Sequence, residues 1–145
     1  LLTISEVVGS QTEIKDPFTG ETMIAVRAIE PDIAVIHAQK ADEYGNIRIE
    51  GPFYEDVIKA KAAKKVVVTV EELISNRDIR KMPEATTIPH FIVDAVVETP
   101  KGAFPCSCFN YYDADYDDIK AYLKAAAQDQ FEQYLDNNVY RRASA

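Results

Sequence analysis

The chain has 145 residues, of which 47% are hydrophobic, and this is enough apolar material to bury the core of one globular domain. Its formal net charge is −8 and its isoelectric point is about 4.7, a balance that argues against binding nucleic acid or an anionic membrane, because such surfaces need clustered Lys and Arg. No apolar run approaches the roughly 20 residues that a membrane-spanning helix requires.

The first part of the chain predicts a strand at residues 2–8, followed by a β-ribbon. Pro17 and Gly20 mark a turn between two extended pieces. The alternation over residues 23–28 is typical of a half-buried strand on the far side of that turn.

The stretch 32–46 organises the rest of the predicted fold. Residues 33–36 are too few for a globular helix and rich in β-branched side chains, so they predict a buried strand. His37, Gln39 and Asp42 follow, and we expect them to crowd around its carboxyl end. In open α/β sheets, ligands bind outside the carboxyl ends of the strands.

A turn over 42–46 then leads into a short strand at 47–49. Segment 53–63 predicts a helix, and 66–70 is a β-branched run typical of a strand covered on both faces. Strand, helix and strand in this order imply a parallel crossover unit. The apolar face expected for the helix consists of Phe53, Val57, Ile58 and Ala62.

Beyond residue 70 we expect the first turn of a short helix at 71–74, a strand at 91–97 and a helical tail from residue 115. Together these elements predict one α/β domain over residues 1–145, with an open, mainly parallel sheet and crossover helices.

Asp113, Asp115 and Asp117 are spaced like the start of a calcium-binding loop. An EF-hand would need glycine and glutamate where Asp118 and Lys124 stand, so the favoured interpretation is a helix start. Negative charge at that position is favourable because of the helix dipole.

Cys106 and Cys108 are separated by one residue, too close to cross-link distant elements, so no disulfide framework is predicted and a cytoplasmic location is expected. They supply two soft ligands, but a zinc site needs two more, and His37 and His90 are distant in sequence. The residue types permit Cys–His nucleophilic catalysis without specific support from the spacing. We therefore predict no metal site.

The remaining polar candidates each have two interpretations. Glu71 and Glu72 at a strand exit face a cleft, or they form a solvated helical turn favoured by the dipole. His37 is a hydrogen-bonded core histidine or a catalytic one. Gly45 and Asn46 serve a site, or they only permit a left-handed turn.

Seven segments, in order and over nearly the whole chain, carry a family resemblance. They resemble the A subunit of the glutaconate-type family I CoA transferases at DPFTGE (16–21), PDIAVIHAQ (31–39), KADEYGN (40–46), VTVEE (68–72), IPH (88–90), VDAVV (93–97) and KGAFP (101–105).

The resemblance implies a CoA-transferase-like α/β fold and a hetero-oligomer of A and B subunits with the active site between them. In such enzymes a glutamate attacks an acyl-CoA thioester, and a glutamyl-CoA thioester then passes CoA to a second carboxylic acid. Coenzyme A is thus implied as part of the acyl-CoA substrate, with no tightly bound cofactor.

Two departures limit what the resemblance implies. The family's catalytic glutamate belongs to the B subunit, so no catalytic residue is expected in this chain. The Gly-rich segment that opens an A subunit is missing, and the chain starts at Leu1, as a processed product, a recombinant segment or the later part of a longer polypeptide would. We expect this chain alone to transfer no CoA.

The residues that match the A-type pattern near the predicted crevice are candidates for substrate binding or interface support. They are His37, Gln39, Asp42, Asn46, Glu71, Glu72 and His90. Two other functions stay open: an acyl-CoA hydrolase of the ring-opening type on the same scaffold, and a non-catalytic interaction module that uses the aromatic residues Phe109, Tyr111 and Tyr112.

Overall fold

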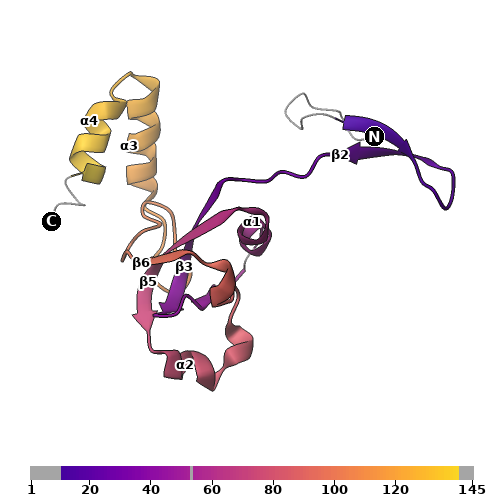
Figure 1. The fold of residues 1–145 in the computed structure, drawn as a ribbon. Helices are drawn as coiled ribbons and strands as arrows, with labels where there is room; N and C mark the ends of the chain where they lie inside the picture. Colours follow the sequence, from indigo (N-terminus) through magenta and orange to yellow (C-terminus); the bar gives the residue numbers. More distant parts are fainter. Residues whose placement is uncertain (1–10, 53, 141–145) are drawn as a thin grey trace.

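A computed structural model describes residues 11–52 and 54–140 (Figure 1). It shows a central α/β body, with a β-ribbon projecting on one side and a helical pair beside the opposite part of the body. The strand expected at 2–8 lies outside the described residues.

The body is built on a four-stranded sheet in the order β4-β3-β5-β6. Strands β3 (Ile33–Asp42), β5 (Lys65–Ile74) and β6 (Ala95–Glu98) run parallel, and β4 (Ile47–Arg48) pairs antiparallel with β3. Helix α1 (Asp56–Ala62) lies on the connection from β4 to β5. The predicted α/β class and parallel crossover are therefore confirmed.

One face of the sheet carries the hydrophobic core. Because successive side chains of a strand point to opposite faces, alternate residues of β3 and β5 meet on this side. Ala60 of α1 is buried against them, and Ile88 joins from the segment before β6 through a bridge with Ile47. The buried strand residues are Ala34, Ile36, Ala38, Val66, Val68 and Val70.

Both long strands continue further than the sequence indicated. The first was expected to end at residue 36 and the second at residue 70, but parallel pairing continues through Lys40 with Glu72 to Asp42 with Ile74. The expected helical turn at 71–74 is therefore wrong. These polar residues remain in strands because ladder hydrogen bonds satisfy their backbones and other segments supply partners for several of their side chains.

Helix α2 (Asn76–Lys81) begins only after β5 ends, where the Ser75 hydroxyl accepts from the Asp78 backbone N–H. A 3-10 helix, η2 (Pro83–Ala85), follows. Arg48 then ties this region to the sheet, because its Nη2 donates to three carbonyl oxygens at the end of α2, at distances of 2.8 to 3.1 Å.

Two other expectations need correction. The buried residue of α1 is Ala60, whereas Ile58, assigned to the apolar face, is 70% exposed. The strand expected at 91–97 starts only at Ala95, because the chain after Pro89 forms a 3-10 turn, η3 (His90–Ile92). Proline fixes its own backbone and has no N–H for a strand ladder, which favours such a turn.

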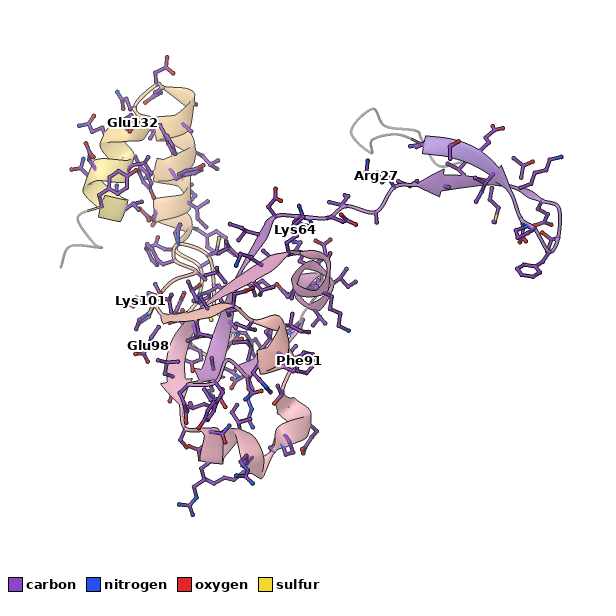
Figure 2. The ribbon with its side chains drawn as sticks, in the orientation of Figure 1. Arg27, Lys64, Phe91, Glu98, Lys101 and Glu132 are labelled. Atoms are coloured by element: carbon purple, nitrogen blue, oxygen red, sulfur yellow. The ribbon has the colours of Figure 1, made fainter. Side chains whose placement is uncertain are left out.

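The predicted β-ribbon is present as β1 (Gln11–Lys15) and β2 (Thr22–Val26), paired antiparallel. Its turn is closed by the Asp16 carboxylate, which accepts from two backbone N–H groups, and by Gly20 at φ 77°. The ribbon extends away from the body beyond Arg27 (Figure 2). The expected half-buried strand is mostly exposed, because no third element of the described chain covers the ribbon.

The tail is helical, as predicted. Helix α3 (Tyr116–Ala127) is capped by Asp115, whose carboxylate accepts from the N–H groups of Asp117 and Asp118, so the helix-start interpretation is confirmed. Helix α4 (Phe131–Leu135) and a π-helical turn, η4 (Asp136–Tyr140), fold back beside it. Among the described residues, no helix is both long and apolar enough to cross a membrane.

The buried contact between Ile47 and Ile88 generates a stability prediction. Ile88→Ala should lower the free energy of unfolding by about 2–5 kcal/mol, because it removes a fully buried side chain and leaves a cavity. Ile58→Ala, the same change on the exposed face of α1, should cost less than about 0.5 kcal/mol. Urea denaturation measures both, and equal losses would contradict this description of the core.

Candidate functional site

The face of the sheet opposite the core carries a polar cluster. His37 of β3 and Thr69 and Glu71 of β5 project from it, two strands that lie side by side. Segment 99–113, which follows β6, covers them and contributes the Lys101 backbone and the Tyr112 side chain.

Glu71 is the centre of this cluster, and its side chain is only 3% exposed. Its Oε1 accepts from the Tyr112 hydroxyl at 2.5 Å and lies 2.8 Å from His37 Nε2. Its Oε2 accepts from the Lys101 backbone N–H at 2.7 Å. Lys101 holds a left-handed backbone, with φ at 62°, at this contact. Both carboxylate oxygens are therefore occupied.

The hydrogen bonds decide the charge state of Glu71. Burial alone raises the pKa of a carboxyl, but the donors Tyr112, Lys101 N–H and His37 outweigh it and hold the pKa of Glu71 below its ordinary value. Burial and the adjacent Glu71 carboxylate in turn raise the pKa of Tyr112 far above its ordinary value. At neutral pH Glu71 is therefore an ionised acceptor and Tyr112 is a neutral donor.

The His37 ring is fixed from three sides. An ionised Glu71 needs a donor, so His37 Nε2 carries a proton, and in the neutral ring Nδ1 accepts from the Thr69 hydroxyl at 2.8 Å. Gly102 lies against the ring: a Cβ at this position would stand 2.7 Å from His37 Cε1. Only glycine allows the loop this close an approach.

Gln39 and Cys108 extend the cluster. The Gln39 carbonyl accepts from the Glu50 backbone N–H at 2.9 Å, and its amide donates to the Phe109 carbonyl at 3.5 Å. Cys108 is buried, and a sulfur, nitrogen and oxygen atom from Cys108, His37 and Glu71 all lie within 4.8 Å of one another. Glu72 lies outside this cluster and is exposed, where it accepts from the Tyr111 hydroxyl at 3.1 Å.

A second cluster closes the turn between β3 and β4. Asp42 is fully buried, and its carboxylate accepts from the N–H groups of Tyr44 and Asn46 and from the side-chain amides of Asn46 and Asn76. Asn46 Oδ1 lies 3.3 Å from the backbone N and from Nδ1 of His90. Gly45, at φ 93°, permits the turn.

The seven predicted site residues therefore do not form one constellation. His37, Gln39 and Glu71 belong to the first cluster, whereas Asp42, Asn46 and His90 form the second and Glu72 stands apart. The expectation that His37, Gln39 and Asp42 crowd together at the end of a short strand is wrong, because β3 continues to Asp42 and spaces them along its length.

Four residues of the first cluster are absent from the predicted set of site residues. They are Thr69, Lys101, Cys108 and Tyr112. The register of β5 would have indicated Thr69, which stands directly beside His37. The other three come from a loop at least 30 residues further along the chain, and no spacing rule connects them to the strands.

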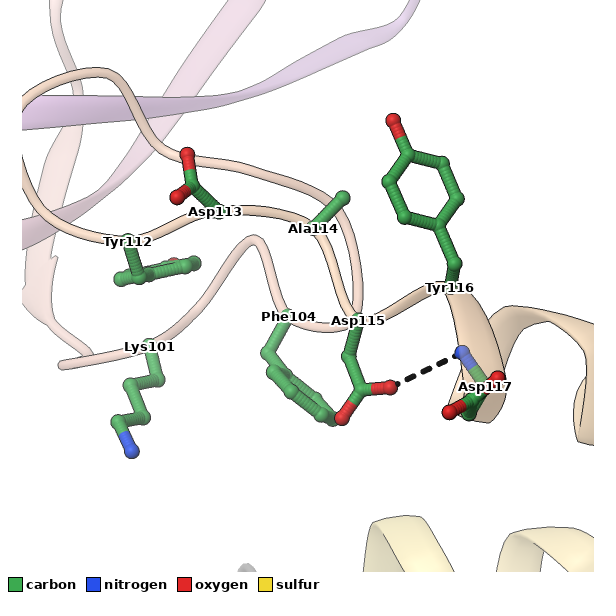
Figure 3. Close-up of a pocket in the computed structure, with 8 residues that line it drawn as sticks. All are labelled: Lys101, Phe104, Tyr112, Asp113, Ala114, Asp115, Tyr116 and Asp117. Carbon is green, nitrogen blue, oxygen red and sulfur yellow. Dashed lines mark hydrogen bonds between the residues drawn. The ribbon is translucent and has the colours of Figure 1, made fainter.

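A hollow of about 480 Å³ lies beside the first cluster (Figure 3). Figure 3 shows Lys101 and Tyr112 on one side, and Asp115 and Asp117 on the other. The first two are the same residues that bond to Glu71, so the shape of this hollow depends on that carboxylate. Its remaining lining residues are Phe104, Asp113, Ala114 and Tyr116.

Comparison with protein families gives a match over most of the chain. Residues 2–99 match the family model described as Coenzyme A transferase. The matched range contains both long strands, the crossover helix and all of the predicted site residues.

The chain is 42% identical over 129 residues to the A subunit of glutaconate CoA-transferase from Acidaminococcus fermentans, covering 88% of this chain and 40% of its relative. The crystal structure of that bacterium's glutaconate coenzyme A-transferase superposes with a TM-score of 0.84 at 41% identity, covering 90% of this chain and 42% of that one.

Two further relatives are more distant. Identity is 39% over 102 residues to the A subunit of 3-oxoadipate CoA-transferase from Pseudomonas knackmussii, covering 70% of this chain and 36% of that protein. Identity is 31% over 111 residues to the Cholesterol ring-cleaving hydrolase IpdA subunit of Mycobacterium tuberculosis, covering 74% of this chain and 38% of that protein. The chain thus spans about two fifths of the length of these relatives.

The contact between Tyr112 and Glu71 generates a second prediction. Tyr112→Phe removes a donor from a buried carboxylate and the acceptor of the Ala103 N–H, so it should lower the free energy of unfolding by about 1.5–3 kcal/mol. Tyr111→Phe, the matched change at the exposed Glu72, should cost less than about 1 kcal/mol. Chemical denaturation measures both, and equal costs would argue against a special role for Tyr112.

The second cluster generates a pH prediction. Burial raises the pKa of Asp42, but the amides of Asn46 and Asn76 and two backbone N–H groups outweigh it, so the folded pKa lies below the ordinary one. The stabilisation is then complete above the unfolded pKa of about 3.9 and is lost as pH falls through the folded pKa.

Urea denaturation of the wild type and Asp42→Asn between pH 7 and pH 3 measures this loss. The wild type should be more stable by about 1–3 kcal/mol at neutral pH, and the difference should shrink in acid. A difference that does not change with pH would show that the Asp42 charge contributes nothing.

Proposed function

The chain belongs to the coenzyme A transferase family, and we propose that it is a portion of an A-type subunit that supports CoA transfer between an acyl-CoA and a carboxylic acid. In this proposal the nucleophilic glutamate stands on a B-type partner in a hetero-oligomer. Coenzyme A enters as part of the acyl-CoA substrate rather than as a resident group.

The observation that carries this proposal is the occupied state of Glu71. A carboxylate that attacks a thioester needs a free oxygen directed at the carbonyl carbon. Both oxygens of Glu71 are engaged, by Tyr112 and His37 on one side and by the Lys101 N–H on the other. Glu72 lies exposed outside the cluster. Neither glutamate is placed as a nucleophile, which supports a nucleophile on another polypeptide.

The proposed chemistry divides one difficult transfer into several acyl exchanges. The partner's carboxylate adds to the thioester carbonyl and CoA thiolate leaves, giving a mixed anhydride. The thiolate then attacks the glutamyl carbonyl, which releases the first carboxylate and leaves a glutamyl-CoA thioester. The acceptor acid repeats these steps in reverse order, and each tetrahedral intermediate requires hydrogen-bond donors at its oxyanion.

The residues of this chain act as supports in that scheme. Glu71, which is hydrogen-bonded to His37, binds Lys101 and Tyr112 of segment 99–113. These two residues also line the hollow. Gln39 holds the backbone at Glu50 and Phe109. Asp42 and Asn46 fix the exit of β3 and the backbone of His90. Rigid placement of such surfaces is what a site shared between two subunits needs.

A second candidate function is hydrolysis of an acyl-CoA, including ring opening, in which water replaces the acceptor acid. The relative named as a Cholesterol ring-cleaving hydrolase subunit, at 31% identity, favours it. The transferase subunits are more similar, at 42% and 39% identity, so transfer is the leading proposal. Product analysis with and without an acceptor acid separates the two, because only a transferase forms a new thioester. A chain that serves only assembly would give neither product.

The proposal predicts activity only in a complex. This chain alone should transfer no CoA, and co-expression with a B-type subunit of the family should give transfer from an acyl-CoA to a carboxylate. A complex that contains the partner subunit with its nucleophilic glutamate changed to glutamine should assemble but remain inactive. An assembled wild-type complex without transfer or hydrolysis would count against the proposal.

The position of the covalent intermediate gives the sharper test. Mass spectrometry of the complex after addition of acyl-CoA should locate the CoA adduct on the partner subunit. Glu71→Gln and Glu72→Gln, each made in this chain, should leave that adduct detectable. An adduct on this chain that disappears in Glu71→Gln or Glu72→Gln would assign the nucleophile here instead.

A further inference from the structure

The polar cluster contains three donors that are typical ligands of a transition metal. Cys108, His37 and Glu71 supply a sulfur, a ring nitrogen and a carboxylate oxygen that all lie within 4.8 Å of one another. They come from a loop, from β3 and from β5, so the fold itself brings them together. Cys108 and Glu71 are buried and His37 is partly buried.

The separations suit a small tetrahedral ion. Zinc bonds of about 2.0–2.3 Å place neighbouring donor atoms about 3.3–3.8 Å apart. His37 Nε2 and Glu71 Oε1, now 2.8 Å apart, would open by roughly half an ångström, and a pair at the 4.8 Å limit would close by about 1–1.5 Å.

The local charge also favours a cation. The Glu71 carboxylate is buried beside the His37 ring and the Cys108 sulfur. A divalent ion at this position would be attracted by the carboxylate charge and would offset it.

We propose that His37, Glu71 and Cys108 form a binding site for a thiophilic divalent cation, for which zinc is the best-matched ion. The mixed nitrogen, oxygen and sulfur donors are those that zinc accepts, whereas magnesium and calcium prefer oxygen alone. Three protein ligands leave the fourth position to a water or to the Tyr112 hydroxyl, which already contacts Glu71 Oε1.

Binding of the cation changes the positions of two protons at this site. The Cys108 thiol releases its proton to solvent as the sulfur binds the cation. The His37 proton moves from Nε2 to Nδ1, where it donates to the Thr69 hydroxyl oxygen at 2.8 Å. The Thr69 hydroxyl then donates to the Ile36 carbonyl, 3.5 Å away. One proton is released for each cation bound to a neutral His37.

The test is a cobalt titration of the reduced, tag-free full chain, with Co²⁺ as the spectroscopic probe and Zn²⁺ as the competitor. The expected result is a thiolate-to-cobalt charge-transfer band that saturates at one cobalt per chain and disappears when zinc is added. Calorimetry of zinc binding in buffers of different ionisation enthalpy should show the release of about one proton.

The two cysteines provide a matched pair of variants. Cys108→Ser should weaken cobalt binding more than about tenfold and abolish the band, because it removes a ligand. Cys106→Ser should leave both unchanged, because Cys106 is exposed and outside the cluster. No band in the wild type, a band that survives Cys108→Ser, or a band lost in Cys106→Ser would overturn the proposal.

Circular dichroism identifies a Cys108→Ser variant that fails to fold, and Glu71→Gln then replaces it. That variant keeps the thiol but replaces the anionic ligand with a neutral amide. Cobalt affinity should fall more than about tenfold, and an unchanged affinity in folded Glu71→Gln would refute the site. None of these measurements needs acyl-CoA, so the outcome is independent of the proposed function.

Discussion

A buried carboxylate determines how the second face of the sheet is built. An unpaired ionised group in a protein interior costs several kcal/mol, so Glu71 has to be surrounded by donors. The donors come from β3 and from segment 99–113, so the segment that buries the charge also supplies hydrogen bonds to it. Gly102 is part of this arrangement, because its missing side chain makes room for the His37 ring. The hollow beside the sheet has its shape for the same reason.

The two faces of the sheet are therefore stabilised differently. One is a conventional apolar core beneath α1, and the other depends on hydrogen bonds to buried polar groups. Toward the amino end of β3, on the polar side, Ile33 and Val35 are 58% and 72% exposed. Parallel sheets are usually covered on both faces, so these residues mark a surface where further protein would pack. That agrees with the proposed place of the chain in a larger assembly.

The parts of the fold that depend on local signals were predictable from sequence. The β-ribbon followed from the turn residues Pro17 and Gly20, the crossover from the order of strand and helix, and the start of α3 from the capping Asp115. The extent of β5 was not, because Glu71 is stable in a strand only through partners from a distant loop. Local charge pattern favoured a helical turn there, and tertiary contacts overrode it.

The candidate site was predictable to a similar degree. Residues on the strands were identified because their polarity stands out against an apolar run, as for His37 and Gln39. Their division into two clusters was not, since it depends on β3 continuing to Asp42. The sequence indicated Cys108 only as a thiol without identified partners and Tyr112 only as one of three aromatic residues, because their contacts with the strands arise only where the loop meets the sheet.

The central claim is that Glu71 holds segment 99–113 on the sheet, and amide hydrogen exchange measures this most directly. The N–H of Lys101 donates to Glu71, and the N–H of Ala103 donates to the Tyr112 hydroxyl that Glu71 also binds. In the wild type both amides should be protected, and in Glu71→Gln both should exchange faster while the Gly20 amide in the ribbon turn stays unchanged. Unprotected Lys101 and Ala103 amides in the wild type, or equal protection in Glu71→Gln, would contradict the account.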